Sequence, residues 1–466
     1  MRTRTIVPVV ASLLFTACAD SGAPATPDAS SIVATATPTT SAGVAAPGSA
    51  TPASSSVSSA APAASTKPTP APVDAADAAL AKKLAASSNA FGFDLWKKLS
   101  ATKGNLVASP ASLSIALSMT YGGAGGETAT EMAKVLHFTG SADDVMKGAG
   151  TLSTQLGDGS HGVTFTIANR LYGEKTYHFE DAFLESTKKA YGAGLEPVDF
   201  RANAEGARAS INGWVESKTD KRITNLIPQG ALSADTRLVL TNAIYFLGDW
   251  ATPFEKAKTR DEAFSTSATD TVQVPTMHRS GSYDFVAADG AQILSMPYAG
   301  GAMRMLVVLP DATDGLGALE SQLDAKKVDA WIGAMKPTEV RVALPKFEID
   351  PVEPIAAGKL LQAMGMKTAF GAKADFKKIA NPSNAADQLM ISEVFHKAFV
   401  KVDEKGTEAA AASAVVMTVK GLAVEPKGVE FKADHPFLFL MRDDATGLVL
   451  FMGRVANPKA TKPQSN

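Results

Sequence analysis

The segment from Asp403 to Lys420 limits the folds that this chain can adopt, because its residues suit both an exposed loop and a buried strand, and the fold must accommodate both. Alternate side chains of a strand lie on opposite faces, so from Thr407 onward one face would carry no charge while Glu408 lies on the other. Such a strand could enter an existing sheet without the large cost of burying an unpaired ion. Alanine, glutamate and lysine also favour helices, so an ordinary surface helix is the alternative. The uncharged face comprises Thr407, Ala409, Ala411, Ser413, Val415, Met417 and Val419.

The first eighteen residues have the pattern of a secretory signal. Arg2 and Arg4 precede an apolar stretch over residues 6–15, which is too short to cross a bilayer. The stretch ends in Phe15-Thr16-Ala17-Cys18, which resembles the lipobox of bacterial lipoproteins, although phenylalanine stands where leucine is usual. We therefore expect residues 1–18 to be a lipoprotein-type signal peptide.

Cys18 is the only cysteine among 466 residues, so the chain cannot form an intramolecular disulfide. A thioether-linked lipid is the use that its position suggests, and an unmodified cysteine in a discarded signal is the alternative. With a lipid on Cys18, we expect a protein of the cell envelope that lies outside the cytoplasm, in the periplasm or exposed at the surface.

The residues after Cys18 divide into a tether, one large domain and a short tail. Residues 19–75 are almost wholly alanine, serine, proline, threonine, glycine and valine, without a periodicity that could bury a face. We expect a disordered tether with a mean span on the order of 40 Å. Residues 76–459 contain no second seam rich in proline and serine, which indicates a single domain, and residues 460–466 form a tail.

The domain begins with helical patterns and ends with strand patterns. Ser109-Pro110 predicts a capped helix that stops at Gly122-Gly123, and residues 127–136 repeat a helical spacing. The apolar run over residues 238–246 predicts a strand that is covered on both faces. The end of the chain reads as a hairpin of residues 437–441 and 448–452. This order predicts an α+β domain.

Catalytic, metal and nucleic-acid motifs are missing from the sequence. It contains no nucleophile elbow, phosphate loop, zinc helix or dinucleotide fingerprint with the required spacing. The six histidines never occur at i and i+4 around a glutamate, and a net charge of −2 with both signs interspersed argues against a nucleic-acid binder. We expect a protein that is not an enzyme and that uses no metal or cofactor.

Four stretches spread over the domain carry the motifs of a known family. They are Asn105-Leu106-Val107-Ala108-Ser109-Pro110 with Ser112, residues 241–250 followed by Pro253-Phe254, residues 431–439, and residues 451–458. From about Ala76 to Pro458 the chain therefore resembles the serpin family of suicide-substrate protease inhibitors. The resemblance implies N-terminal helices packed on a large central mixed sheet, further sheets, an exposed reactive-centre loop at about residues 404–430, and a monomer.

In the serpin family a protease cleaves the loop, and the freed loop then enters the main sheet while the protease is still attached as an acyl-enzyme. The resemblance identifies a hinge at which this insertion begins. The alternative for this chain is a non-inhibitory serpin that acts as a binding or scaffolding protein. The hinge comprises Glu404, Lys405, Gly406, Thr407, Glu408, Ala409, Ala410, Ala411 and Ala412.

The same resemblance places the scissile bond. Glu404, counted as the first of the family's seventeen residues up to that bond, puts it at Lys420-Gly421. A lysine there is typical of a bond cleaved by trypsin-like proteases, because their primary pocket ends in an aspartate. We expect the target proteases to lie outside the cytoplasm. A solvated lysine in a loop that is cleaved elsewhere is the alternative, since cleavage after Met417, Val419 or Leu422 would favour chymotrypsin-like or elastase-like proteases.

Two further groups of residues take their roles from the resemblance. Ser109, Ser112, Asn242 and His396 would form a polar cluster that controls whether the strands of the central sheet part. Trp250 and Lys346 would lie with Glu404 where the loop first enters the sheet, and Lys346 would pair with Glu404 as an exposed ion pair. Ordinary core or surface packing is the alternative for each.

Overall fold

The structure, a computed structural model, describes residues 73–157, 163–192, 194–384, 387–407 and 428–459. The chain divides into two units, residues 1–67 and 68–466, and every described residue lies in the second. No helix among these residues is long and apolar enough to cross a bilayer. The expected signal peptide, almost all of the expected tether, and the expected tail lie outside the described residues, as do Cys18, Glu408, Ala409, Ala410, Ala411, Ala412, Lys420 and Gly421.

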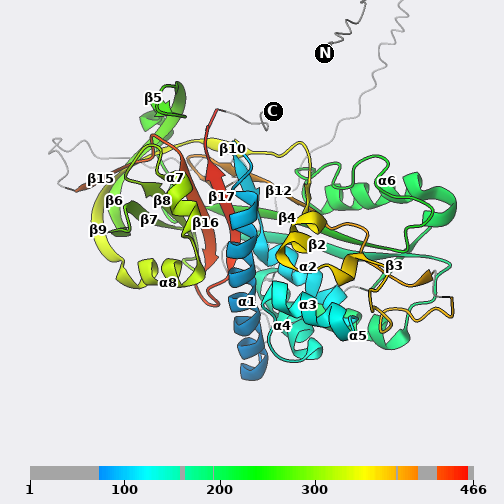
Figure 1. Ribbon diagram of the computed structural model, residues 1–466. Coiled ribbons are helices and arrows are strands. Elements are labelled where there is room, and N and C mark those ends of the chain that lie inside the picture. Colours follow the sequence, from blue (N-terminus) through cyan, green and yellow to red (C-terminus); the bar gives the residue numbers. More distant parts are fainter. Residues whose placement is uncertain (1–72, 158–162, 193, 385–386, 408–427, 460–466) are drawn as a thin grey trace, which may run out of the picture. The chain divides into compact units, whose positions relative to one another are not determined.

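A nine-stranded sheet forms one part of the described domain (Figure 1). The predicted C-terminal hairpin is confirmed: its two strands pair antiparallel around a turn in which Gly447 takes a positive φ of 76°. In spatial order the strands are β1 (Leu106–Ala108), β17 (Val449–Val455), β16 (Phe437–Asp443), β8 (Met303–Pro310), β7 (Ala291–Pro297), β6 (Thr271–Ala288), β9 (Lys336–Pro345) and β15 (Val429–Lys432), and β5 (Arg260–Ser265) pairs with β6.

An eight-stranded sheet forms the other part, and its central strand is β4 (Leu238–Asp249). β4 covers the predicted run of residues 238–246 and is buried along nearly its whole length, so that prediction is confirmed. On one side lie β2 (Thr164–Glu174) and β3 (Glu196–Val198). On the other side lie β12 (Phe395–Ala398), β13 (Val400–Val402), β14 (Gly406–Thr407), β10 (Phe347–Ile349) and β11 (Ile355–Ala356).

The helices follow the predicted signals. Ser109 caps the second helix by accepting a hydrogen bond from the backbone N–H of Ser112, Pro110 opens its first turn, and Gly123 follows its end. The helices are α1 (Ala75–Leu99), α2 (Pro110–Gly122), α3 (Gly126–Leu136), α4 (Ala142–Gly157), α5 (Asp181–Tyr191), α6 (Phe200–Lys218), α7 (Leu316–Ser321), α8 (Ala325–Ala334) and α9 (Ala357–Met364), with short 3₁₀ turns at η1 (Lys256–Lys258) and η2 (Thr368–Phe370).

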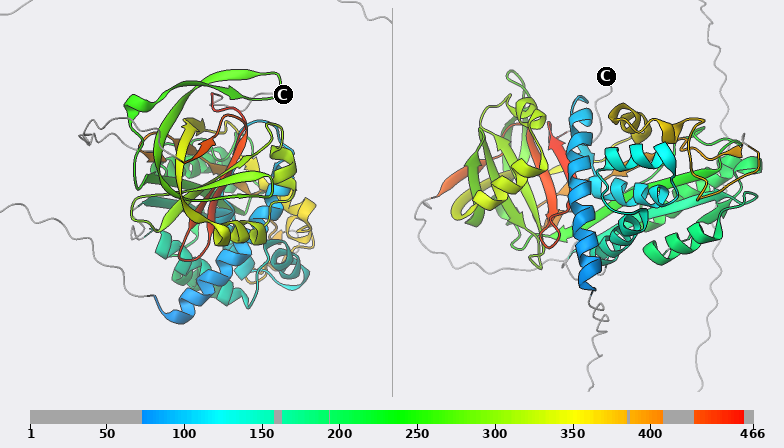
Figure 2. Two further views of the ribbon diagram at one scale, coloured as in Figure 1. Left: turned by 90° about the vertical axis from the view of Figure 1, so that its left-hand side faces the viewer. Right: turned by 60° about the horizontal axis from the view of Figure 1, so that its bottom comes forward.

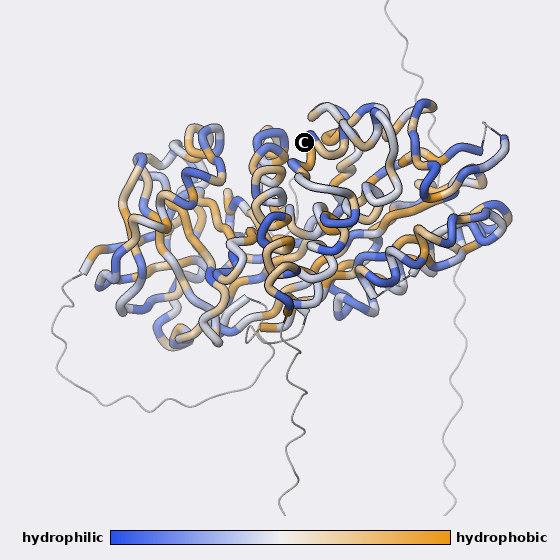
Figure 3. Tube along the Cα trace, turned by 90° about the horizontal axis from the view of Figure 1, so that it is seen from below, coloured by the Kyte–Doolittle hydropathy of each residue, from blue (hydrophilic) through white to orange (hydrophobic). Residues whose placement is uncertain are grey.

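Two apolar cores hold these layers together. The larger core joins α1 and α2 to both sheets, and α1 stands between the nine-stranded sheet and the long strands β2 and β4 (Figure 2). The smaller core lies under α6, where Phe200, Ile211 and Val215 pack with Ala168 and Ala243 of the eight-stranded sheet. Hydrophobic residues run along the strands and inner helices, while hydrophilic residues gather in the outer turns (Figure 3). The predicted α+β fold class is confirmed, and β4 is covered on both faces.

Candidate functional site

Two different partners share the same edge of β4. Residues 241–244 of β4 pair in parallel with residues 395–398 of β12, and we call this contact the closed joint. Further along β4, Thr407 pairs antiparallel with Gly248, and Gly406 with Asp249, so that β14 separates β4 from β13. We call this second contact the opened joint. Over the first stretch β4 and β12 are therefore paired directly. Over the second stretch Gly406 and Thr407 of the hinge already lie between β4 and β13.

The four residues of the predicted polar cluster meet at the closed joint. The Asn242 side-chain amide donates to the hydroxyl and the carbonyl oxygen of Ser112, both at 2.6 Å. The oxygen of the same amide lies 2.6 Å from Nδ1 of His396, and the backbone N–H of Ser109 donates to Nε2 of His396 at 2.9 Å. All four residues are fully buried. Their predicted proximity is confirmed, and the hydrogen bonds tie α2 to the two strands that would have to part.

His396 is neutral in this cluster. Its Nε2 accepts a hydrogen bond, so its single proton lies on Nδ1 and is donated to Asn242. Burial lowers the pKa of His396 to about 3, because no carboxylate compensates for the lost hydration of the charged ring. The closed joint is therefore held by neutral hydrogen bonds at ordinary pH.

Lys346 and Glu404 meet beside the opened joint, with Nζ and Oε2 2.9 Å apart, so their predicted pairing is confirmed. The prediction that the pair is exposed is wrong, since the side chain of Glu404 is only 6% exposed and that of Lys346 is 36% exposed. Burial opposes the ionisation of Glu404, but hydrogen bonds from Lys346 and from the Thr259 hydroxyl outweigh it, and the pKa of Glu404 lies below its ordinary value. The carboxylate is drawn inward because these donors replace water.

Trp250 holds the turn that leads into the hinge, as its predicted position requires. Its backbone N–H donates to the carbonyl oxygen of Lys405 at 2.7 Å, and its indole N–H donates to that of Asp403 at 3.1 Å. The Asp403 N–H in turn donates to the carbonyl oxygen of Gly406 at 2.9 Å. The hinge therefore leaves β13 in a tight, fully bonded reversal.

The start of the hinge is buried, which differs from the predicted exposed loop from residue 404 onward. Gly406 and Thr407 are buried because they form β14 and pair with β4, and Glu404 is buried beside its donors Lys346 and Thr259. A Cβ on Gly406 would lie 2.0 Å from the carbonyl oxygen of Gly248, so only glycine allows this close approach. Thr407 is 1% exposed and faces the core, as predicted for the uncharged face of the entering strand.

Two residues of the site were not predicted from the sequence. Asn169 of β2 accepts a hydrogen bond from the Asn242 amide at 2.8 Å and extends the polar cluster to a third strand. Tyr298 lies against Thr407, with their hydroxyl oxygens 2.7 Å apart. The available signal for Tyr298 was an aromatic residue with a polar end, placed between Pro297 and Gly300-Gly301.

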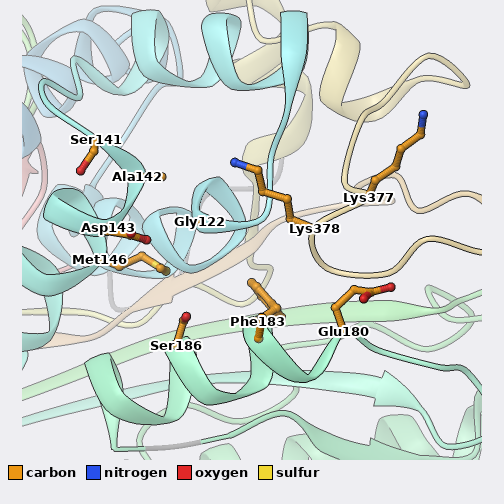
Figure 4. Close-up of a pocket in the computed structure, with 11 residues that line it drawn as sticks. Gly122, Ser141, Ala142, Asp143, Met146, Glu180, Phe183, Ser186, Lys377 and Lys378 are labelled. Carbon is orange, nitrogen blue, oxygen red and sulfur yellow. The ribbon is translucent and has the colours of Figure 1, made fainter.

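A pocket of about 470 Å³ lies elsewhere in the described domain (Figure 4). It is formed by the end of α2, the start of α4, one face of α5 and the loop of Lys377 and Lys378. Lys378 reaches across toward Ala142, whereas Lys377 points away. None of its lining residues belongs to the polar cluster or to the hinge. In the part of the chain that the structure describes, no three histidine, cysteine or acidic side chains are grouped as a metal site would need.

Comparison with known proteins decides the family. A family model described as "Serpin (serine protease inhibitor)" matches residues 86–458. The chain belongs to the serpin family. Leukocyte elastase inhibitor A from Rattus norvegicus is 40% identical over 368 residues, which cover 77% of this chain and 94% of the relative. Serpin B4 from Homo sapiens is 37% identical over 373 residues, which cover 76% and 94%. Membership of this family means that the protein is not an enzyme.

Solved serpin structures share the fold of the described domain. Uncleaved ovalbumin matches with a TM-score of 0.71 and 31% identity, over 80% of this chain and 100% of ovalbumin. Human thyroxine-binding globulin matches with a TM-score of 0.73 and 29% identity, over 82% of this chain and 100% of that protein. A loop-inserted structure of a cleaved ovalbumin mutant also matches, with a TM-score of 0.71 and 30% identity.

Proposed function

We propose that this serpin is an inhibitory, suicide-substrate inhibitor of trypsin-like serine proteases outside the cytoplasm. The observation that supports it is the opened joint, where Gly406 and Thr407 already pair with β4 as the first residues of an added strand. The uncharged face of the remaining loop sequence can follow Thr407 into the sheet without burying an ion. The loop-inserted structure of the cleaved ovalbumin mutant supports the same movement by analogy.

The proposed inhibition is a race between insertion and hydrolysis. The protease serine attacks the carbonyl of Lys420, the peptide bond to Gly421 breaks, and the loop is held as an ester on the protease. Insertion of the freed strand drags the protease and distorts its triad and oxyanion hole before water can release it. The uncleaved fold must then be protected by a kinetic barrier, because the form with the added strand is more stable.

A denaturing gel tests this function directly. Equimolar incubation with trypsin is expected to produce a covalent complex that resists SDS, together with loss of trypsin activity. Cleavage of the loop without a complex would contradict the inhibitory function and support a binding or scaffolding serpin. That second function has a specific observation in its favour, since a complex of thyroxine-binding globulin with thyroxine shares the fold at 29% identity with a TM-score of 0.71.

The thermal stability of cleaved protein gives a second test. Cleavage should raise the unfolding temperature sharply, because the loop becomes a new central strand with hydrogen bonds to both neighbours. An unchanged melting curve after complete cleavage would contradict insertion.

The target class rests on the assignment of Lys420-Gly421 as the scissile bond. Mass spectrometry of the peptide released on reaction with trypsin would identify the bond. The names of the relatives favour a second target, since several are called leukocyte elastase inhibitors, and cleavage after Met417, Val419 or Leu422 would fit that specificity. Complex formation with elastase and not with trypsin would favour this second target.

We also propose that a lipid on Cys18 anchors the protein in the cell envelope and that residues 19–75 carry the inhibitor away from the membrane. The support is the signal-like pattern of residues 1–18 and the composition of the tether. Replacement of Cys18 by alanine should move the protein from the membrane fraction to the soluble fraction. Equal distribution of the two forms would contradict the anchor.

A further inference from the structure

Tyr298 links the nine-stranded sheet to the opened joint. It directly follows β7, forms an antiparallel bridge with Trp250, and its N–H donates to the carbonyl oxygen of Met303 at 2.9 Å. Its ring stacks on Trp250, with 4.7 Å between centroids and 11° between planes, and meets Phe246 edge-on at 5.0 Å. Backbone and ring contacts therefore hold Tyr298 in one place.

The hydroxyl of Tyr298 faces the first inserted side chain. It lies 2.7 Å from Oγ1 of Thr407, and the two residues are 0% and 1% exposed. Within the described part of the chain, this is the hydrogen bond that satisfies the Tyr298 hydroxyl. Burial raises the pKa of Tyr298 far above its ordinary value, so the phenol keeps its proton. A buried hydroxyl without a partner is costly, so the two side chains depend on each other.

The position of this pair matters because the register of a strand determines which side chains face the core. A slip of one residue moves every side chain to the opposite face. A slip in one direction would bring Gly406 to Tyr298, which offers no hydroxyl, and a slip in the other would bring Glu408, which carries a charge. Only the observed register gives Tyr298 a neutral partner and keeps the uncharged face inward.

We propose that Tyr298 is the positioning residue for the entering loop: its hydroxyl binds Thr407 and sets the register in which the cleaved strand inserts. The proposal rests on the inhibitory function proposed above. With Thr407 bound to Tyr298, the first strand pairs of the inserting loop are already formed in the correct register, so insertion only has to extend them. Without it, insertion slows, and more of the acyl-enzyme is hydrolysed before the protease is trapped.

A set of four variants tests the pairing. Tyr298→Phe leaves the Thr407 hydroxyl without its partner, and Thr407→Val leaves that of Tyr298 without one. Each should raise the ratio of cleaved inhibitor to covalent trypsin complex about tenfold. The double variant removes both hydroxyls and should recover most of that loss, while Thr407→Ser keeps a hydroxyl and should stay within about twofold of the unmodified protein.

Tyr191→Phe is the matched control. Its hydroxyl oxygen also lies 2.7 Å from a partner hydroxyl, that of Ser118, but this pair joins α5 to α2 and not the hinge to the sheet. The control should lower thermal stability about as much as Tyr298→Phe and leave the ratio of cleaved inhibitor to complex unchanged. An equal rise in that ratio for both tyrosine variants would overturn the proposal.

Hydrogen exchange of the uncleaved protein tests Tyr298 without a protease. The peptide that covers Gly406 and Thr407 should exchange at least about tenfold faster in Tyr298→Phe and Thr407→Val than in the unmodified protein. In Thr407→Ser and Tyr191→Phe its exchange rate should be unchanged. If the unmodified protein forms no complex with trypsin but the variants still show these differences in exchange, the inhibitory function fails and the positioning role stands. Equal exchange in all variants, or additive effects in the double variant, would overturn the positioning role.

Discussion

The closed joint and the opened joint lie on the same strand, yet they are held by different chemistry. At the closed joint, β4 and β12 pair directly, and neutral side chains that are all fully buried lock the strands to α2. At the opened joint, β14 lies between β4 and β13, beside an aromatic stack and an ion pair whose lysine is 36% exposed. One joint resists parting, whereas the other already accepts a strand.

This difference suggests how one sheet can keep its strands paired before the loop is cleaved and let them part afterwards. The hinge lies beside an ion pair that is still partly open to solvent, while the polar cluster must lose several mutually dependent hydrogen bonds before the strands can part further. In the proposed mechanism the closed joint would therefore set the barrier to insertion, and the opened joint would set the end of the sheet from which insertion proceeds.

The largest expected effect comes from placing a charge at the opened joint. Thr407→Arg would bury an unpaired guanidinium beside Tyr298, at a cost of about 3 kcal/mol or more. We expect the cleaved loop to stay out of the sheet, so that the ratio of cleaved inhibitor to trypsin complex rises by at least about a hundredfold on a denaturing gel. Normal complex formation by this variant would contradict insertion at Thr407. Glu408→Arg, on the predicted outward face, is the control and should have a much smaller effect.

Removal of the central amide breaks the closed joint instead. Asn242→Ala leaves Ser112, Asn169 and His396 without the hydrogen bonds they share with it, which should lower the free energy of unfolding by about 3 kcal/mol. The variant should also form loop-linked polymers at a lower temperature than the unmodified protein, as seen on a native gel, because the strands part more easily.

Asn212→Ala is the control for that experiment. Its side chain is buried in α6 and makes two hydrogen bonds of 2.9 Å to Ile227, outside the closed joint. We expect it to lower stability without promoting polymers. Equal polymer formation by both variants would mean that general instability, and not the closed joint, controls opening.

Acid sharpens the comparison, because His396 is the titrating group of the closed joint. In the unfolded chain His396 binds a proton near pH 6.5, but in the fold only near pH 3, so the free energy of unfolding falls as the pH drops between these values. At pH 5 the loss should be about 2 kcal/mol relative to pH 7.5. Denaturant unfolding at the two pH values measures it.

The same measurement on His396→Gln separates this histidine from others. His278 also has a lowered pKa, chiefly through burial, and contributes to acid sensitivity in both proteins. The difference in slope between the unmodified protein and His396→Gln therefore reports the closed joint alone. Parallel curves would show that His396 does not couple the closed joint to pH.

Much of the architecture could be predicted from local signals. The cap at Ser109 and the proline after it begin α2 where expected, and the apolar run of β4 and the C-terminal hairpin lie where their patterns indicated. The polar cluster came from family motifs and not from local pattern, because Ser112 and His396 are separated from Asn242 by 130 and 154 residues.

The sequence could not predict that Gly406 and Thr407 already pair with β4. Side-chain alternation states which face of the strand is uncharged, and Thr407 faces inward as expected. The place of Gly406 and Thr407 beside β4 depends instead on tertiary contacts, namely the close approach of Gly406 to Gly248 and the hydrogen bond between Thr407 and Tyr298. The pairing of Glu404 with Lys346 came from the family resemblance, but its burial escaped prediction because the second donor, Thr259, is distant in sequence.

The smallest expected effect comes from the ion pair at the opened joint. Lys346→Met should lower the free energy of unfolding at pH 7 by only about 1 kcal/mol, because the lysine is partly exposed and solvent screens the pair. The lowered pKa of Glu404 means that its stabilisation is present above about pH 4.3, the ordinary value for the unfolded chain, and is lost as the pH falls through the folded value. The variant and the unmodified protein should thus converge in denaturant unfolding as the pH falls through the folded pKa of Glu404. A difference that stays constant as the pH is lowered from 7 would assign the role of Lys346 to the packing of its aliphatic chain and not to its charge, and the two joints would then differ less in chemistry than their contacts suggest.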